Sequence, residues 1–310
     1  MDSPFPALSR LRIVLGGAVA ALALALGACG GDDDDEGATV AETTPAPPRP
    51  ESGTLVFAVG DAADGEEAST ALAEFIVRQS PDRFFYLGDV YERGTRADFR
   101  GHYEPMYGAL ADRTDPTIGN HEFVLRERGY YAYWRGKRGW SREQAKHRAY
   151  VDEPSGWQII SYSSQTPDIE AEAEWVRAQI DKHPGTCRIV MAHKGRHVVA
   201  DTVHTDNLEQ EPVWSALVGT TAINLVGHNH IYGRLEPIRG VHVIVSGAGG
   251  HDLRDLGEQH HPAAASSTHV PSATRLVLRR GEARVTQLDA TGTVLDRTTI
   301  ACVPADEAGP

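Results

Sequence analysis

A short apolar segment followed by a metal-type side chain recurs along this chain. The sites that follow these segments are Gly60-Asp61, Gly88-Asp89, Gly119-Asn120-His121-Glu122, Ala192-His193 and Gly227-His228-Asn229-His230. Apolar runs of four to six residues bounded by glycine are typical of buried strands. In open α/β sheets, ligands bind beyond the carboxyl ends of the strands. The repeated pattern therefore predicts that Asp, Asn and His side chains from five strands gather at one edge.

The segments between these sites predict an α/β sheet with parallel strands, because strand and helix patterns alternate. Strands are predicted at 54–59, 83–87, 115–118, 158–162, 188–191, 222–226 and 241–245, and helices at 66–79, 95–110, 168–182 and 209–218. The last strands, at 275–279, 283–288 and 293–300, are predicted to be antiparallel.

Residues 123–148 form an insertion rich in aromatic and basic side chains. Side chains of these two kinds can stack nucleobases when they are interleaved. We favour the alternative, a surface loop that its own aromatic residues hold near the mouth of the site.

The two ends of the chain differ in composition from the predicted domain at 54–301. Residues 1–28 combine two early arginines with the apolar stretch 13–26, which is typical of a signal peptide and too short to span a membrane comfortably. The stretch ends in Leu26-Gly27-Ala28-Cys29, which resembles the lipobox of bacterial lipoproteins and implies a lipid anchor on Cys29. The alternative is an ordinary signal peptide followed by an unrelated cysteine. Residues 29–53 are acidic and proline-rich, which predicts a disordered tether, and residues 302–310 are predicted to be a tail.

Charge and cysteine content limit the partners of the chain. The formal net charge of −13 over 310 residues gives no basic surface for nucleic acid, so no specific nucleic-acid partner is expected. Lipidation of Cys29 would place the domain outside the cytoplasm, anchored to the cell membrane. The other two cysteines, Cys187 and Cys302, would then form a possible disulfide in an oxidising compartment. The oligomeric state is not indicated.

The side chains at the predicted strand ends form a mixed oxygen and nitrogen ligand set. Carboxylates, imidazoles and an amide carbonyl suit Zn, Mn or Fe better than a metal that seeks thiolates. They outnumber the ligands that one ion needs, so two ions are implied. Two ions about 3.5–4 Å apart can generate hydroxide at neutral pH and stabilise an in-line displacement at phosphorus.

The order of the five blocks resembles that of the calcineurin-like metallophosphoesterases, which include the purple acid phosphatases, over about residues 54–250. The resemblance implies a four-layer αββα sandwich of two mixed β-sheets and a centre of two divalent or trivalent metal ions. It assigns Asp61, Asp89 and His230 to the first ion, and Asp89, Asn120, His193 and His228 to the second. His121 would protonate the leaving oxygen.

Two departures from the family pattern affect the first ion. Most members carry a histidine two residues after the first aspartate, where this chain has Ala63. Purple acid phosphatases instead use a tyrosine three residues after the bridging aspartate, but here that position is Glu92 and the tyrosine is Tyr91. The block is closer to that of Ser/Thr phosphatases, which implies that the Glu92 carboxylate orients His121 and that Arg93 binds phosphate. Tyr91, Asp64 or water would complete the first site, and a tyrosinate ligand would favour ferric iron.

The expected function is hydrolysis of phosphomonoesters outside the cytoplasm. The alternatives are a phosphodiesterase or nucleotidase, and a lipoprotein that binds metal or phosphate without catalysis. Ala63 favours the lipoprotein.

The remaining histidines are weaker candidates for the site. His197 and His204 are expected either to touch phosphate or to lie in solvent. Four further histidines are interpreted as surface residues: His251, His260, His261 and His269.

Overall fold

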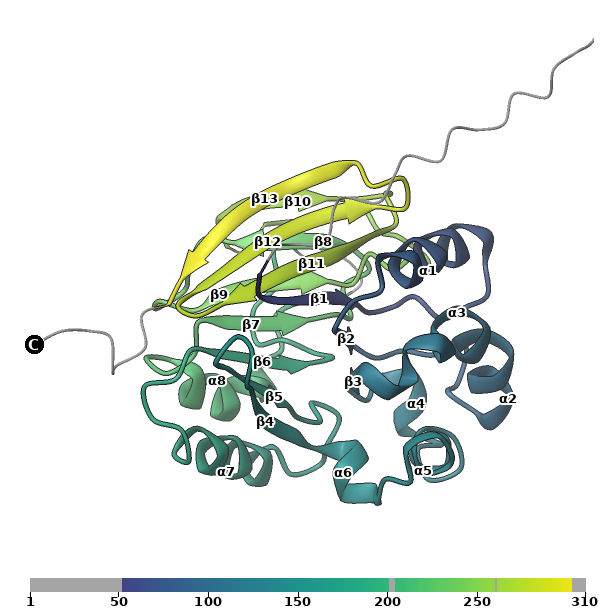
Figure 1. Cartoon of the computed structure of the whole chain (residues 1–310), viewed down its shortest axis with the longest axis horizontal. Helices are drawn as coiled ribbons and strands as arrows, with labels where there is room; N and C mark the ends of the chain where they lie inside the picture. The colour runs from purple at the N-terminus through teal and green to yellow at the C-terminus, as the bar shows by residue number, and fades with distance from the viewer. Residues whose placement is uncertain (1–51, 201–203, 260, 303–310) are drawn as a thin grey trace, which may run out of the picture. The chain divides into compact units, whose positions relative to one another are not determined.

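The computed structural model describes residues 52–200, 204–259 and 261–302 (Figure 1). The predicted signal peptide, the lipidation site Cys29, the tether up to residue 51 and the tail from residue 303 lie outside the described residues. Within the described part of the chain, no helix has both the length and the apolar character needed to cross a membrane.

The first sheet contains six strands in the order β13-β12-β11-β1-β2-β3. Their bounds are β1 (Thr54–Val59), β2 (Arg83–Tyr86), β3 (Thr114–Pro116), β11 (Ser272–Arg279), β12 (Glu282–Asp289) and β13 (Val294–Ala301). β1, β2 and β3 are parallel, and β11 to β13 are antiparallel, as the sequence predicts. Val59 pairs with Tyr86 and Tyr86 with Pro116, so the carboxyl ends of β1, β2 and β3 lie level with one another.

The second sheet contains seven strands in the order β10-β8-β9-β7-β6-β5-β4. Their bounds are β4 (Arg148–Asp152), β5 (Trp157–Ser161), β6 (Arg188–Ala192), β7 (Ile223–Val226), β8 (Tyr232–Leu235), β9 (His242–Ser246) and β10 (Ala263–Ser267). β5, β6, β7 and β9 are parallel, and the three strands that the sequence analysis missed, β4, β8 and β10, are antiparallel to their neighbours.

The two sheets pack face to face, and helices cover their outer faces. The core between the sheets is formed by apolar side chains from both, among them Val56, Phe85, Leu87, Ile189, Met191 and Leu225. α1 (Glu67–Gln79) and the helices up to α6 pack on the first sheet, whereas α7 (Ile169–Ile180) and α8 (Glu211–Leu217) pack on the second (Figure 1). The fold is therefore the predicted αββα sandwich of two mixed sheets.

The predicted helix at 95–110 is a series of short turns. It consists of α2 (Arg96–Asp98), a π-helical turn (Phe99–Tyr103), α3 (Glu104–Tyr107) and a 3₁₀ turn (Gly108–Arg113). The other short helices on this side are α4 (Asn120–Phe123), α5 (Tyr130–Arg138) and α6 (Arg142–Lys146), and a 3₁₀ turn (Leu208–Gln210) precedes α8.

The interpretation of residues 123–148 as a surface loop is wrong. The insertion forms α5 and α6, and its aromatic residues Tyr130, Tyr131, Trp134 and Trp140 are buried. They join the core beneath the first sheet, because aromatic rings bury a large apolar area when they pack together. Buried rings are also inaccessible for stacking on nucleobases.

A disulfide joins Cys187, just before β6, to Cys302, just after β13, with a Cα–Cα distance of 5.7 Å. The pairing that the cysteine count suggested is therefore observed. It links the two sheets at the amino-terminal end of β6, whereas His193 follows the carboxyl end of the same strand.

Candidate metal centre

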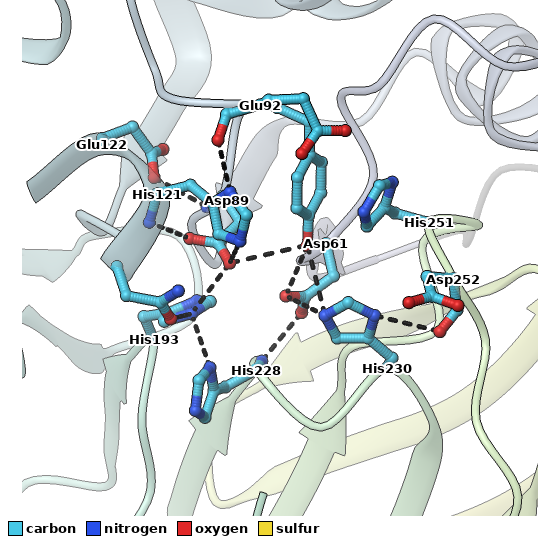
Figure 2. Close-up of polar contacts among 12 residues, drawn as sticks. Asp61, Asp89, Glu92, His121, Glu122, His193, His228, His230, His251 and Asp252 are labelled. Atoms are coloured by element: carbon cyan, nitrogen blue, oxygen red, sulfur yellow. Dashed lines mark hydrogen bonds and ion pairs between the residues drawn. The ribbon is translucent and has the colours of Figure 1, made fainter. Parts of the chain in front are cut away.

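The parallel strands of both sheets direct their carboxyl ends at one cluster of side chains (Figure 2). In the first sheet, Asp61 follows β1, Asp89 follows β2, and Asn120 and His121 follow β3. In the second sheet, His193 follows β6, and His228 and His230 follow β7. The convergence predicted from the sequence is thus present, and each sheet contributes side chains to the same site.

Four of these residues have a left-handed backbone, which is uncommon outside glycine. The φ angles are 57° at Asp61, 66° at Asp89, 73° at His228 and 51° at His230. Asp, Asn and His enter this region more readily than most side chains, and such strain concentrates at functional sites. The conformation turns the chain sharply as it leaves each strand, which brings the side chains back over the strand ends.

Two glycines permit the close approach of the strand-end loops. A Cβ at Gly119 would lie 1.9 Å from Asp89 Oδ1, and one at Gly88 would lie 2.7 Å from His193 Nδ1. Gly88 also has a φ of +93°, which a residue with a side chain rarely adopts. Any larger residue at either position would displace a member of the cluster.

On one side of the cluster, three ligand atoms surround His193 Nε2 at the spacing of a metal site, so that four ligand atoms could share one ion. Nε2 lies 3.0 Å from Asn120 Oδ1, 3.1 Å from His228 Nδ1 and 3.3 Å from Asp89 Oδ2. Ligands bonded to one ion at about 2.0–2.2 Å are separated from each other by about 2.9–3.4 Å. Asp89, His193 and His228 are all buried. The set fits the second ion of the predicted pair.

The other side of the cluster contains Asp61, His230 and the phenol of Tyr91. The Tyr91 hydroxyl lies 3.3 Å from Asp61 Oδ1, 3.3 Å from His230 Nε2 and 3.5 Å from Asp89 Oδ2. His230 Nε2 lies 3.6 Å from Asp61 Oδ1. Asp64 instead accepts hydrogen bonds from Ser69 and from the Glu66 amide. Of the side chains considered for the place that Ala63 leaves, only Tyr91 therefore points at this group.

Hydrogen bonds outside the cluster fix which nitrogen of each ring faces inward. His193 Nδ1 donates to the Leu87 carbonyl at 2.7 Å. His230 Nδ1 donates to the Asp252 carbonyl at 3.1 Å (Figure 2). Because a carbonyl only accepts, Nε2 of each ring is left for the centre. The two carboxylates are held by amides: the His228 N–H donates to Asp61, and the His121 N–H donates to Asp89.

Burial and the neighbouring charges set the protonation of the metal-free cluster. Burial raises the pKa of Asp61, and the histidines only partly offset this. Burial opposes ionisation of Asp89 too, but there the charge of His193 outweighs it and lowers the pKa. In return, Asp89 raises the pKa of His193 to about 9 against the effect of burial. Burial and the charge of His193 lower the pKa of His228, so its ring is neutral and able to bind a cation.

Glu122, the last residue of the Gly-Asn-His-Glu block, supports Asp89 rather than joining the cluster. Its Oε2 accepts the Asp89 N–H at 3.1 Å, and its side chain is fully buried. Burial, together with the charge of Asp89, raises the pKa of Glu122 well above its ordinary value. A neutral carboxyl group can accept this bond without adding negative charge beside Asp89.

His121 lies at the solvent side of the cluster, with 29% of its side chain exposed and Nε2 3.9 Å from Asp89 Oδ2. Its Nδ1 donates to the backbone carbonyl of Glu92 at 2.5 Å, so the expected contact with the Glu92 carboxylate is replaced by one with the main chain (Figure 2). The Glu92 and Arg93 side chains are exposed. A role for Arg93 in binding phosphate stays a prediction.

Two histidines that sequence reasoning placed on the surface or left open pack against the cluster. The His251 ring stacks on Tyr91 with 3.4 Å between ring centroids, and its Nδ1 lies 3.1 Å from Asp64. The His204 ring stacks on His228 at 3.7 Å. His269 is exposed and pairs with Asp255, whereas His260 is not among the described residues. The glycine-rich turn before His251 was the only sequence signal for its position.

The sequence matches no protein-family model and no curated protein sequence. Solved structures do share its fold. GAP50, the anchor in the inner membrane complex of Plasmodium, matches with a TM-score of 0.68 and 13% identity, covering 81% of this chain and 90% of that one. A dimetal phosphatase from Danio rerio matches with a TM-score of 0.53 and 13% identity, covering 81% of this chain and 100% of that one. This chain therefore shares one fold with both an anchor protein and a dimetal phosphatase.

Proposed function

We propose that this chain is a metal-dependent phosphoesterase that hydrolyses phosphomonoesters with two bound metal ions. The observation that carries the proposal is the position of Asp89. This buried carboxylate lies between the group formed by Asn120, His193 and His228 and the group formed by Asp61, His230 and Tyr91. A single carboxylate that faces two sets of ligand atoms is what a bridged pair of ions requires.

The donor atoms support Fe, Mn or Zn at both positions, since they combine carboxylate, imidazole, amide and phenol groups. When bound, a pair of such ions supplies a hydroxide nucleophile at neutral pH and neutralises the charge that develops on phosphorus-bound oxygens. Asp89 would contact both ions. Burial and nearby carboxylates raise the pKa of Tyr91 well above its ordinary value, so its ligation as tyrosinate requires a strongly acidic ion such as ferric iron.

His121 would give the proton that the leaving oxygen needs. The Glu92 carbonyl holds Nδ1–H and thereby directs Nε2 toward the cluster. When His121 is the imidazolium, Nε2 carries a proton next to the place where the ester bond breaks. Arg93 is exposed beside this position and is proposed to bind the phosphate group.

The direct test is hydrolysis of p-nitrophenyl phosphate by the full chain after removal of metal and reloading with Mn, Zn or Fe. We expect turnover that depends on metal and falls by about 10²–10⁴-fold in His121→Ala, while the metal content is unchanged. The matched control is His183→Ala, which removes an exposed histidine outside the cluster. Bound metal without turnover in the wild-type protein would overturn the proposal.

Monoester preference is tested with bis-p-nitrophenyl phosphate as the competing substrate. His121 is 29% exposed, so the proposed proton donor lies at the open side of the cluster. A higher kcat/KM for the diester would replace the proposed activity with that of a phosphodiesterase or nucleotidase.

A second candidate is a protein that binds metal or phosphate without catalysis. Two observations favour it: Ala63 stands where most members of the resembling family carry a ligand, and the fold is shared with GAP50, which is an anchor. A protein of this kind would retain its metals and its ligand affinity in His121→Ala, and it would show no turnover with any metal.

We also propose that the chain is a bacterial lipoprotein anchored outside the cytoplasm through Cys29. The disulfide between Cys187 and Cys302 supports an oxidising compartment, since disulfides are rare in the cytosol. Membrane fractionation of cells that express the full chain tests this. The wild-type protein should be in the membrane fraction and should take up labelled palmitate, whereas Cys29→Ala should take up none. An unlabelled wild-type protein would contradict the lipid anchor.

A further inference from the structure

A second group of ligand-type side chains lies in the loop between β6 and α8, apart from the residues of the proposed dinuclear centre. His197 and Asp206 come from this loop, and His261 comes from the segment that leads into β10. The two segments are 55 residues apart between Asp206 and His261. They are also joined by an isolated antiparallel bridge between Ala200 and Gln259.

The three ligand atoms of this group form a compact triangle. His261 Nε2 lies 2.9 Å from Asp206 Oδ2, His197 Nδ1 lies 3.2 Å from His261 Nε2, and His197 Nδ1 lies 3.4 Å from Asp206 Oδ2. These separations equal the spacing of about 2.9–3.4 Å between ligands that share one ion at 2.0–2.2 Å. They also match the 3.0–3.3 Å spacing around His193 Nε2 in the proposed dinuclear centre.

We propose that His197, Asp206 and His261 form a third metal site that binds a transition-metal dication such as Zn²⁺. Two imidazoles and one carboxylate form a ligand set that such ions favour. The side chains of Asp206 and His261 remain 20% and 22% exposed, which leaves solvent access for a further ligand.

The surrounding contacts hold the group in place. The Val198 N–H donates to Asp206 Oδ1 at 2.9 Å, which leaves Oδ2 directed at the two imidazoles. The edge of the His197 ring packs against Trp214, with 4.5 Å between ring centroids. Contacts of this kind around the ligands are typical of metal sites, because they fix the orientation of each donor.

Arg196 is the main competitor for the carboxylate. Its Nη1 lies 3.1 Å from the same Asp206 oxygen that would bind the ion, while its Nε donates to Glu211 at 2.7 Å. A positive guanidinium at this distance opposes the binding of a cation. Replacing Arg196 by a neutral residue is therefore expected to raise the metal affinity of the third site. If the group were only an ion pair with Arg196, the same change would not increase metal binding.

An ion bound at the third site would link the loop after β6 to the segment before β10, close to the proposed dinuclear centre. The same loop carries His204, whose ring stacks on His228, and the Asn229 side chain donates to the His204 carbonyl at 3.4 Å. An ion at the third site would therefore hold the loop residue that covers a predicted ligand, without itself contacting the substrate.

The test is a count of bound metal in the full chain after exhaustive chelation, reloading with Zn²⁺ and removal of excess ion. We expect His261→Ala to hold one equivalent fewer than the wild-type protein and His183→Ala to hold the same number. Arg196→Gln should hold the full number, with an affinity at the third site that is at least as high. Equal metal content in wild type and His261→Ala would overturn the proposal.

A second measurement uses a more conservative variant, in case the alanine variants fold poorly, and it does not depend on activity. Co²⁺ titration of Asp206→Asn, which keeps the Oδ1 contact to Val198, should lack one of the visible absorption steps of the wild-type protein. Loss of the same step in His197→Ala would support the assignment. Identical titrations for the wild type and Asp206→Asn would refute it.

Discussion

The two halves of the proposed dinuclear centre are built differently. In the half around His193, ligand atoms from Asn120, His228 and Asp89 lie 3.0–3.3 Å from Nε2. In the other half, Asp61, His230 and Tyr91 are separated by 3.3–3.6 Å. Tyr91 lies in the loop after β2, two residues beyond Asp89, and its hydroxyl points at Asp61 and His230.

The two halves depend on different parts of the structure for the positions of their ligands. The half around His193 is completed by residues next to the ends of three strands, whose positions the two sheets fix. The half around Tyr91 depends on the conformation of a loop and on the ring of His251 stacked against it. We therefore expect the half around His193 to tolerate changes poorly, and the half around Tyr91 to vary in which metal it binds.

The largest effect is expected from Asp89→Ala, because this residue belongs to both halves. Loss of the shared carboxylate should release both ions and lower kcat/KM by about 10³-fold or more, equivalent to several kcal/mol of transition-state stabilisation. Metal analysis and phosphate-ester kinetics on the same sample measure the two losses. The control is Asp255→Ala, which removes an exposed carboxylate. A variant that keeps one ion and most of its activity would show that the halves are independent.

The next effect is expected from Gly119→Ala, which leaves every proposed ligand intact. The added Cβ would lie 1.9 Å from Asp89 Oδ1, so Asp89 must move, and we expect a loss of metal with destabilisation of about 1–3 kcal/mol. Gly136→Ala is the matched control, because its Cβ meets nothing within 4 Å in helix α5. That change should stabilise the protein by up to about 1 kcal/mol. Urea unfolding and metal content distinguish the two, and unchanged metal in Gly119→Ala would contradict the close packing described.

A smaller effect is expected from Tyr91→Phe, which acts on one half alone. The variant should keep the ion held by His193 and lose about tenfold in kcat, because the remaining carboxylates and His230 still bind the other ion. With iron loaded, the tyrosinate-to-iron absorption band should disappear. A loss as large as that of Asp89→Ala would mean that the phenol is essential to both halves.

The smallest effect on activity is expected from the double variant Cys187→Ala/Cys302→Ala. The disulfide lies at the opposite end of β6 from His193, about five strand residues or ~17 Å away. Its removal should lower the free energy of unfolding by about 2–4 kcal/mol and leave kcat/KM within twofold at 25 °C. Thermal unfolding and kinetics check both parts. A large loss of activity in a folded sample would show that the site depends on the link between the sheets.

The sequence predicted β1, β2, β6 and β7, which deliver most of the proposed ligands, because these strands are short, largely apolar runs that are buried. β3 is short and polar, and only the Gly-Asn-His-Glu block that follows it indicated its position. The sequence analysis missed β4, β8 and β10 for physical reasons. β8 contains Gly233 and Arg234, β10 is composed of Ala and Ser, and β4 is only partly buried along most of its length. None of the three has the apolar pattern that marks a strand. The aromatic insertion was misread because its helices are short: α5 has nine residues with Gly136 among them, and α6 has five, which is too few turns for a clear period.

The proposed ligands could be predicted because their residue types and their order along the chain form a pattern. The contacts that could not be predicted are made by backbone atoms or join segments that are far apart in the sequence. The Glu92 carbonyl holds His121, and no side-chain pattern encodes a main-chain acceptor. His251 lies 160 positions after Tyr91, and His261 lies 64 positions after His197. Such pairs come together only in the folded chain, so a single sequence gives no local signal for them.

The left-handed backbone at Asp61 and Asp89 affects how this chain can change over evolution. Asparagine tolerates that conformation about as well as aspartate and has nearly the same shape, but it carries no charge. One such exchange would remove the charge that holds the ions while the loops and sheets keep their form. If the site binds metal as proposed, a single exchange of this kind would abolish the binding while the fold persists as a scaffold.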